Sequence, residues 1–290
     1  MTERVIEVGV VNAFVKDGAG GNPAGVVLDA DNLTEVEMQS LAARVGYSET
    51  AFVSKHADGG FRLDFFTPNR RIADCGHATV AAFAHMATKG IVKDGETVKH
   101  TVDGPRKVII RDGQAFMEQL APKYDNVVDV QAVLTSLGLD EEDLIAGHVP
   151  VVVNTGNSFM LVGVRDAATL AAIQPDQAKI EAISEAHDLI GYYVFTLEGE
   201  GADATTRMFA PRYGIAEEAA TGMAAGPLAC LLHDRFGVQG PLLAIEQGRY
   251  MTPPSESMIH VKLSLDGQGR IAGLMAGGSA KPGDAVEASL

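Results

Sequence analysis

Hydrophobic positions along the chain follow two kinds of pattern. Short runs rich in β-branched and aromatic residues are typical of β-strands. They lie at residues 5–14, 24–29, 49–54, 61–66, 107–112, 149–156, 159–164 and 192–198. The segments between them carry the three- to four-residue apolar spacing of amphipathic helices. Strands and helices in one chain of this length predict an α/β or α+β protein.

The clearest early helix lies at residues 33–46. Thr34 and Glu37 have the spacing of a capping box, and Gly46 is a typical helix stop. The apolar face consists of Met38, Leu41, Ala42 and Val45. Residues 129–139 and 176–191 show the same pattern and predict two further helices.

A repeated sequence motif divides the chain into two parts. Phe-x-Pro occurs at 66–68 and at 209–211, and each copy continues with Ile-Ala-acid, at 72–74 and at 215–217. A glycine and an alanine-rich helical segment follow in both places. Such an ordered series indicates two topologically similar halves.

We place the boundary between the halves at residue 122, which gives domains at 1–122 and 123–290. The last ~15 residues are candidates to return to the first half. The tail at 277–290 is rich in glycine and polar residues, and we expect it to be at least partly mobile.

Charge limits the classes of partner. The formal net charge is -15 and the pI is about 4.9, so nucleic acid and anionic membrane surfaces would be repelled. A small anionic substrate would need local hydrogen-bond donors. Gly76 and Gly222 each open a predicted helix, and if the halves face each other, the two helix N-termini could bind one carboxylate.

The N-terminus lacks the pattern of a secretory signal, and no apolar run approaches the roughly 20 residues of a membrane helix. Only Cys75 and Cys230 are present, so we expect reduced thiols and a cytoplasmic protein. The spacings of common metal-binding motifs do not occur, and we expect no metal.

Cys75 and His77 flank the first helix start. A thiol at a helix N-terminus would have a lowered pKa and could act as a nucleophile or base, although small buried cysteines in turns are common. His77 could shuttle a proton, or could simply bond to nearby backbone. Glu49 lies between a helix stop and an apolar strand, where burial would raise its pKa toward neutrality, as a general acid/base needs. A solvated turn residue is the alternative.

Glu217 and Glu218 precede the second helix start. They could stabilise the helix dipole or supply a second acid/base group. The segment at 18–25 lacks the spacing and the lysine of a phosphate loop, so Asn22 belongs to a tight connection into the next strand.

Six short motifs stand out along the chain. They are GNPAGVV at 21–27, YSETAFV at 47–53, FFTP with CGHAT at 65–79, NTGNSFMLV at 154–162, EEAATGMAAG at 217–226 and EQGRYMTPPS at 246–255. Together, and in this order, they resemble the PhzF-like family of phenazine-biosynthesis isomerases, relatives of diaminopimelate epimerase and proline racemase.

The resemblance implies an α+β fold of the diaminopimelate epimerase type. Two pseudo-symmetric domains would each wrap a curved mixed sheet, or barrel, around a central helix, with the active site between them. It also implies a homodimer that needs no metal or organic cofactor. The reaction implied is proton transfer at carbon on a small carboxylate, which moves a double bond.

The resemblance also implies roles for individual residues. Glu49 matches the acid/base glutamate, His77 the histidine of the first helix start, and Glu218 an aspartate of the second. The residues implied to bind substrate are Asn22, Cys75, Gly76, Thr221, Gly222 and Met223.

Departures from the family pattern leave other functions open. Glu218 replaces Asp, Ala219 replaces Pro, Met223 replaces Ser, and Arg71 stands at a commonly acidic place. The related epimerases use two thiols, whereas here only Cys75 aligns. A Cys75-dependent epimerase or dehydratase of an amino or imino acid is one alternative. A non-catalytic dimer that binds a small acid is another.

Overall fold

A computed structural model describes residues 4–126, 129–240 and 242–290. The chain forms two compact units, Met1–Glu118 with Gly277–Leu290, and Gln119–Ala276. The boundary falls inside strand β8 (Gln114–Leu120), slightly before the residue 122 expected from sequence. Both strands and helices are present throughout, and the fold is α+β.

The first unit contains two main helices, α1 (Glu35–Val45) and α2 (Gly76–Thr88). Its strands before β8 are β1 (Val5–Ala13), β2 (Asn22–Val27), β3 (Thr50–Lys55), β4 (Phe61–Phe66), β5 (Arg71–Ile72), β6 (Gly95–Thr101) and β7 (Gly104–Arg111). β1 is antiparallel to β2, β2 is parallel to β3, and β3 is antiparallel to β4. β4 is antiparallel to β5 and parallel to β6, which is antiparallel to β7.

The second unit contains helices α3 (Val130–Leu137), α4 (Ala167–Ala172), α5 (Gln177–Ala186) and α6 (Gly222–Phe236). Its strands are β9 (Lys123–Asn126), β10 (Val151–Asn154), β11 (Ser158–Gly163), β12 (Gly191–Thr196), β13 (Ala204–Ala210), β14 (Ile215–Glu218), β15 (Leu243–Gln247), β16 (Ser257–Leu265) and β17 (Ile271–Gly278).

The strand directions of the second unit repeat those of the first. β10 is antiparallel to β11, β11 is parallel to β12, and β12 is antiparallel to β13. β13 is antiparallel to β14 and parallel to β15, which is antiparallel to β16. The topological similarity of the two halves, which the repeated Phe-x-Pro motif predicts, is therefore confirmed.

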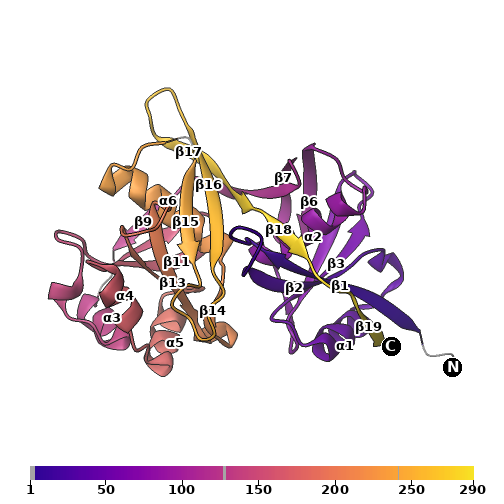
Figure 1. Cartoon of the computed structure of the whole chain (residues 1–290), viewed down its shortest axis with the longest axis horizontal. Helices are drawn as coiled ribbons and strands as arrows, with labels where there is room; N and C mark the ends of the chain where they lie inside the picture. Colours follow the sequence, from indigo (N-terminus) through magenta and orange to yellow (C-terminus); the bar gives the residue numbers. More distant parts are fainter. Residues whose placement is uncertain (1–3, 127–128, 241) are drawn as a thin grey trace. The chain divides into compact units, whose positions relative to one another are not determined.

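Each unit is built around one buried helix. Nearly every residue of α2 is buried, and the helix packs against β1, β2, β3, β7 and β18 (Ala280–Pro282). Figure 1 shows α2 within the first unit. Gly9 of β1 lets this strand approach α2 closely, because a Cβ added at Gly9 would lie 2.7 Å from Nε2 of His85. α6 is similarly buried and packs against β10, β11, β15 and β16. A helix that is apolar on all sides is stable only when surrounded in this way.

The predicted capping box begins α1. The Glu37 backbone N–H donates to Thr34 Oγ1 (3.3 Å), and the Thr34 N–H donates to Glu37 Oε2 (2.7 Å). Gly46 ends the helix with φ 72°, in the left-handed region that glycine adopts readily.

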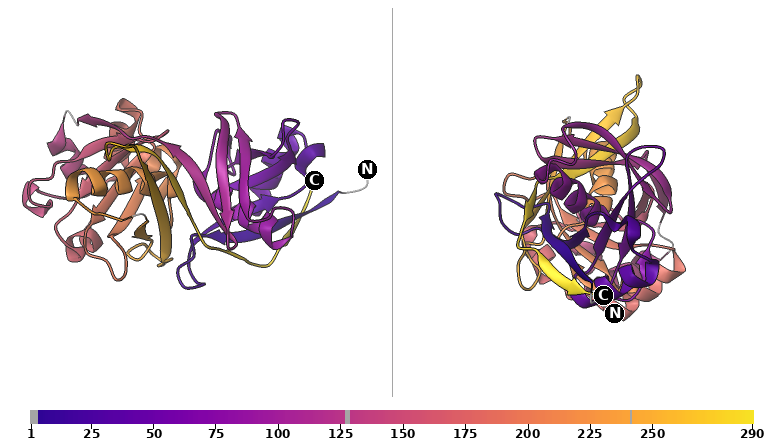
Figure 2. Two further views of the ribbon diagram at one scale, coloured as in Figure 1. Left: turned by 90° about the horizontal axis from the view of Figure 1, so that it is seen from above. Right: turned by 90° about the vertical axis from the view of Figure 1, so that its right-hand side faces the viewer.

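The C-terminal tail differs from expectation. It was expected to be partly mobile, but it forms β18 (Ala280–Pro282) and β19 (Val286–Ser289), and both pair with β1. Figure 2 shows this last segment running beside β1. Backbone pairing with a long strand needs no hydrophobic run, and so the composition of the tail did not reveal it.

In the described part of the chain, no helix combines the length and the apolar character needed to cross a membrane.

Candidate functional site

Glu49 lies immediately before β3 in the first unit. Its backbone carbonyl accepts a hydrogen bond from the Gly25 N–H of β2 (3.0 Å), which anchors it to the sheet. Its side chain turns inward, and the residue is only 5% exposed. The interpretation of Glu49 as a solvated turn residue is therefore wrong.

Cys75 is the N-cap of the central helix α2, Gly76 is its first residue, and His77 follows. All three are buried, with His77 only 2% exposed. The N-terminus of a helix concentrates backbone N–H groups and the positive end of the helix dipole. This end of α2 can therefore stabilise negative charge next to an imidazole.

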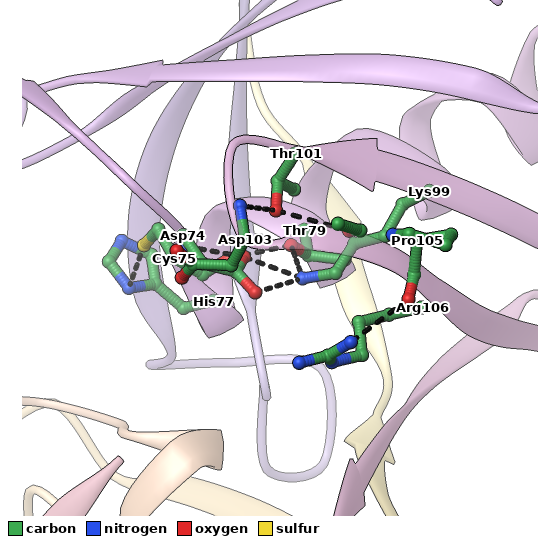
Figure 3. Close-up of polar contacts among 10 residues, drawn as sticks. Asp74, Cys75, His77, Thr79, Lys99, Thr101, Asp103, Pro105 and Arg106 are labelled. Atoms are coloured by element: carbon green, nitrogen blue, oxygen red, sulfur yellow. Dashed lines mark hydrogen bonds and ion pairs between the residues drawn. The ribbon is translucent and has the colours of Figure 1, made fainter. Parts of the chain in front are cut away.

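The side chains of Glu49, His77 and Cys75 form a line through the imidazole ring. His77 Nε2 lies 3.2 Å from Glu49 Oε2, and Cys75 Sγ lies 3.5 Å from His77 Nδ1. Figure 3 shows the contact of Cys75 with His77 at the start of the helix. Two predicted catalytic residues and one predicted binding residue thus meet in the first unit.

The pKa of Glu49 does not follow the expectation from sequence. Burial alone would raise it, but the charge of His77 and hydrogen bonds from His77 and Ser48 outweigh burial, so the pKa lies below its ordinary value. The expected rise toward neutrality is therefore wrong. Glu49 carries a carboxylate at neutral pH and is ready to accept a proton.

The pKa of Cys75 also departs from expectation. Burial raises it above the ordinary thiol value and the Glu49 carboxylate adds to the rise, while His77 opposes it. The expected lowering at a helix N-terminus is wrong because desolvation of a thiolate outweighs the helix dipole here. Cys75 is therefore a neutral thiol at pH 7.

Glu49, Cys75 and His77 carry donor atoms of the types that bind metal ions. One ligand atom from each of Glu49, Cys75 and His77 can be chosen so that all three lie within 4.8 Å of one another. His77, however, directs Nε2 at Glu49 and Nδ1 at Cys75, so a metal ion held by all three would have to replace the existing Glu49–His77 pair. The arrangement as it stands suits proton transfer between partners already in contact.

The second unit holds the other predicted group of site residues. Glu218 ends β14, and it is 9% exposed. Its Oε2 accepts a hydrogen bond from Thr221 Oγ1, the N-cap residue of α6. Gly222 and Met223 are the first residues of that helix, so the start of α6 repeats the start of α2.

A glutamine that sequence reasoning did not single out organises this second group. Gln247 is fully buried, and its Nε2 donates to the Glu218 carbonyl (2.7 Å) and to Thr221 Oγ1 (3.1 Å). Its Oε1 accepts from the Thr221 N–H (3.0 Å) and from Tyr193 OH (2.9 Å). Gln247 lies in the EQGRYMTPPS motif, which was the one signal for it.

Three further predicted residues have other positions. Asn22 is buried at the start of β2, the strand that anchors Glu49. Glu217 forms a double ion pair with Arg207 (both contacts 2.8 Å), which favours a structural role. Arg71 forms ion pairs with Asp64 and Glu35 rather than with Glu49 or His77.

Comparisons with known proteins agree with this architecture. The model of the phenazine biosynthesis-like protein family matches residues 11–281. An isomerase from Clostridium acetobutylicum is 35% identical over 78% of this chain and 79% of its own. The trans-2,3-dihydro-3-hydroxyanthranilate isomerase of Pseudomonas aeruginosa is 32% identical over 85% of this chain and 87% of its own.

Among solved structures, a phenazine biosynthesis protein of the PhzF family from Bacillus anthracis superposes with a TM-score of 0.89. It is 25% identical, and the match covers 98% of this chain and 99% of the other. The family match spans nearly the whole chain, and the fold agrees with it. The chain belongs to the phenazine biosynthesis-like, or PhzF, protein family.

Proposed function

We propose that the protein is an isomerase that transfers a proton between two carbons of a small carboxylate, with Glu49 as the acid/base group. The observation that carries the proposal is the buried pair of Glu49 and His77, 3.2 Å apart at the N-terminus of a buried helix. Relatives named as isomerases support the reaction class.

The step requires one proton and two electron pairs to move. The Glu49 carboxylate removes a C–H proton, the C–H electrons form a new C=C bond to the neighbouring carbon, and the electrons of the old double bond move to its far carbon. Protonated Glu49 then returns the proton to the carbon that has gained negative charge. The bond order is redistributed, and no atom is lost.

A carboxylate with a lowered pKa is a weak base, so the developing carbanion needs stabilisation. Backbone N–H groups at Gly76 supply donors without a net positive charge, which suits this acidic chain. His77 holds the carboxylate and can share the proton it gains. Glu218, hydrogen-bonded to Thr221, is proposed as a second proton-relaying group.

The substrate class proposed is a small cyclic carboxylic acid. The named substrate of the Pseudomonas aeruginosa relative, a dihydro-hydroxyanthranilate, belongs to this class and is the first probe. Glu218 and Met223 differ from the usual Asp and Ser, so the physiological substrate is expected to be another acid of the same class. The proposed reaction uses no metal or organic cofactor. The proposed assembly is a homodimer.

Proton NMR in deuterated buffer tests the reaction class. The protein is mixed with dihydro-hydroxyanthranilate and with a panel of small cyclic acids and amino acids. Deuterium that enters a C–H position, together with a shifted double bond, supports the isomerase. Exchange at the α-carbon of an amino acid without a double-bond shift would instead support an epimerase. Saturable binding without any exchange would contradict catalysis and favour the binding protein.

The Cys75-dependent reaction is a second candidate because Cys75 Sγ lies 3.5 Å from His77 Nδ1, within reach of a base. The raised pKa of Cys75 weighs against it, since little thiolate exists at neutral pH.

The proposed homodimer predicts a solution mass of twice the 30.5 kDa chain in light scattering.

A further inference from the structure

A buried lysine lies directly behind the start of α2. Lys99 of β6 is 1% exposed, although a buried ammonium group is unfavourable unless it is paired and hydrogen-bonded. Its Nζ lies 2.5 Å and 2.8 Å from the two carboxylate oxygens of Asp74 and 3.2 Å from Thr79 Oγ1. It also lies 5.9 Å from the ring centroid of Phe65. These polar contacts of the ammonium group thus lie at the N-terminal end of α2.

Both partners of Lys99 hold the backbone of Cys75. Asp74 Oδ1 accepts a hydrogen bond from the Cys75 N–H (2.7 Å), and Thr79 Oγ1 donates to the Cys75 carbonyl (2.6 Å). Figure 3 shows Asp74 and Thr79 between Lys99 and this residue. The two peptide groups of Cys75 are therefore fixed by side chains that Lys99 ties together.

The orientation of Cys75 determines where His77 lies. Cys75 is the N-cap with extended backbone (φ -147°, ψ 123°), and His77 is the second residue of the helix that follows. A change in the cap would rotate the first turn of α2. It would thereby alter the 3.2 Å contact of His77 Nε2 with Glu49 Oε2. Displacements of about 1 Å in a catalytic group can lower rates by about 10²-fold.

We propose that Lys99, Asp74 and Thr79, here called the Lys99 cluster, are positioning residues that hold His77 against Glu49. The cluster touches the backbone of the helix start, so it acts through Cys75 on the imidazole. For catalysis the inference rests on the proposed function, but the position of His77 can be measured without any substrate.

The first test is NMR of the 15N-labelled imidazole rings in the full-length protein. His77 signals are assigned by their loss in His77→Gln. Lys99→Met removes the ammonium group while keeping an unbranched apolar stem. We expect the His77 ring nitrogens to shift or broaden in Lys99→Met. They should be unchanged in Lys107→Met, a matched control whose lysine is half-exposed on β7 and pairs with Glu96 at the surface.

The second test is kinetic and uses a mild pair of variants at one position. Thr79→Val removes the hydroxyl with almost no change in volume, and Thr79→Ser keeps it. Loss of positioning predicts a fall in kcat of about tenfold for Thr79→Val with KM within about twofold, and recovery to within about twofold of wild type for Thr79→Ser. A purely structural role would lower the thermal midpoint of both and leave kcat unchanged below it.

The outcomes separate the two proposals. Wild-type His77 signals in both Lys99→Met and Thr79→Val would overturn the positioning role, whatever the enzyme does. If the variants alter the His77 signals but the wild-type protein catalyses no exchange, the positioning role stands and the proposed function fails. If Lys99→Met does not fold, the Thr79→Val and Thr79→Ser pair decides alone.

Discussion

At the scale of single residues, two opposing effects act on the pKa of Glu49. Burial favours its neutral form, whereas His77 at 3.2 Å favours the carboxylate, and His77 prevails. In the proposed reaction, a carboxylate that is already ionised can act as the base throughout the physiological pH range. A carboxylate with a lowered pKa is also a weaker base, so hydrogen-bond donors at the helix start must stabilise the developing carbanion.

The lowered pKa of Glu49 sets the acid limb of the pH profile. The base must be ionised, and its pKa lies below the ordinary 4.5. We therefore expect kcat/KM to stay level as the pH falls from 7 to about 5 and to decline only below the ordinary carboxyl range. Stopped-time NMR assays across this range measure it. A decline centred between pH 6 and 7 would contradict a pre-ionised Glu49.

Replacement of Cys75 separates the two candidate bases. Because burial raises the pKa of the thiol, Cys75→Ala is expected to leave kcat within about threefold of wild type. Cys75→Ser is the matched variant that keeps a polar atom near His77. A loss of about 10³-fold in Cys75→Ala would transfer the role of base to the thiol.

Sequence reasoning identified Glu49, Cys75 and His77, and the structure brings their side chains together. It misjudged both pKa directions because neither the Glu49–His77 contact nor the full burial of the thiol is visible in spacing. Lys99 was missed for a related reason. A lysine in a strand is ordinarily solvated, and only the three-dimensional packing shows that this one faces a helix start.

At the scale of elements, the pattern predicted the helices well. The Thr34 cap, the left-handed Gly46 and the helices starting at Gly76 and Gly222 all agree with the structure. Strands without long apolar runs were missed, notably β6 and the tail strand β19. Their pairing depends on backbone hydrogen bonds with distant strands, which local composition does not encode.

The capping box of α1 yields a stability prediction. Thr34→Ala removes the acceptor of the Glu37 N–H and is expected to lower the free energy of unfolding by about 1 kcal/mol. Thr34→Ser keeps the hydroxyl and should retain most of that free energy. Urea unfolding followed by circular dichroism measures both variants. Equal losses would show that the cap contributes nothing.

The tail strand yields a second prediction at this scale. Deletion of residues 284–290 removes β19 and the contact of Ala288 with the apolar cluster that includes Val8 and Leu41. We expect faster hydrogen exchange at the amides of β1 and a lower thermal midpoint. Unchanged exchange along β1 in the truncated chain would mean that the tail adds no stability there.

For the whole molecule, repetition of one topology explains why each unit presents the N-terminus of a buried helix. The glutamate beside it comes from a different place in each repeat, because Glu49 precedes β3 whereas Glu218 ends β14. Glu49 accompanies α2 and Glu218 accompanies α6. The two groups are not equivalent, because Glu49 contacts a histidine and Glu218 contacts a threonine.

The buried His148 of the second unit contributes to the pH dependence of stability in the acid range. Burial lowers the pKa of His148 to about 4, and Arg235 adds to the effect. Since an unfolded histidine titrates near 6.5, the unfolded state binds the proton first, and stability falls as the pH drops from 6.5 to 4. The full shift corresponds to about 3 kcal/mol.

His148→Leu should remove this part of the pH dependence, since the ring packs against Phe195 and Phe236 rather than making a charged contact. Urea titrations at pH 7, 5.5 and 4.5 measure it, with the exposed His187→Gln as control. An identical loss of stability in His148→Leu and wild type would assign the acid lability to other groups.

The most direct test of the central claim is deuterium incorporation by Glu49→Gln. Glutamine fills the same volume beside His77 but cannot accept the proton, so incorporation into a substrate of the wild-type enzyme should fall by at least about 10³-fold. Glu7→Gln, which changes an exposed glutamate of β1 in the same unit, should match wild type. Incorporation that persists in Glu49→Gln at the wild-type rate would contradict Glu49 as the acid/base group.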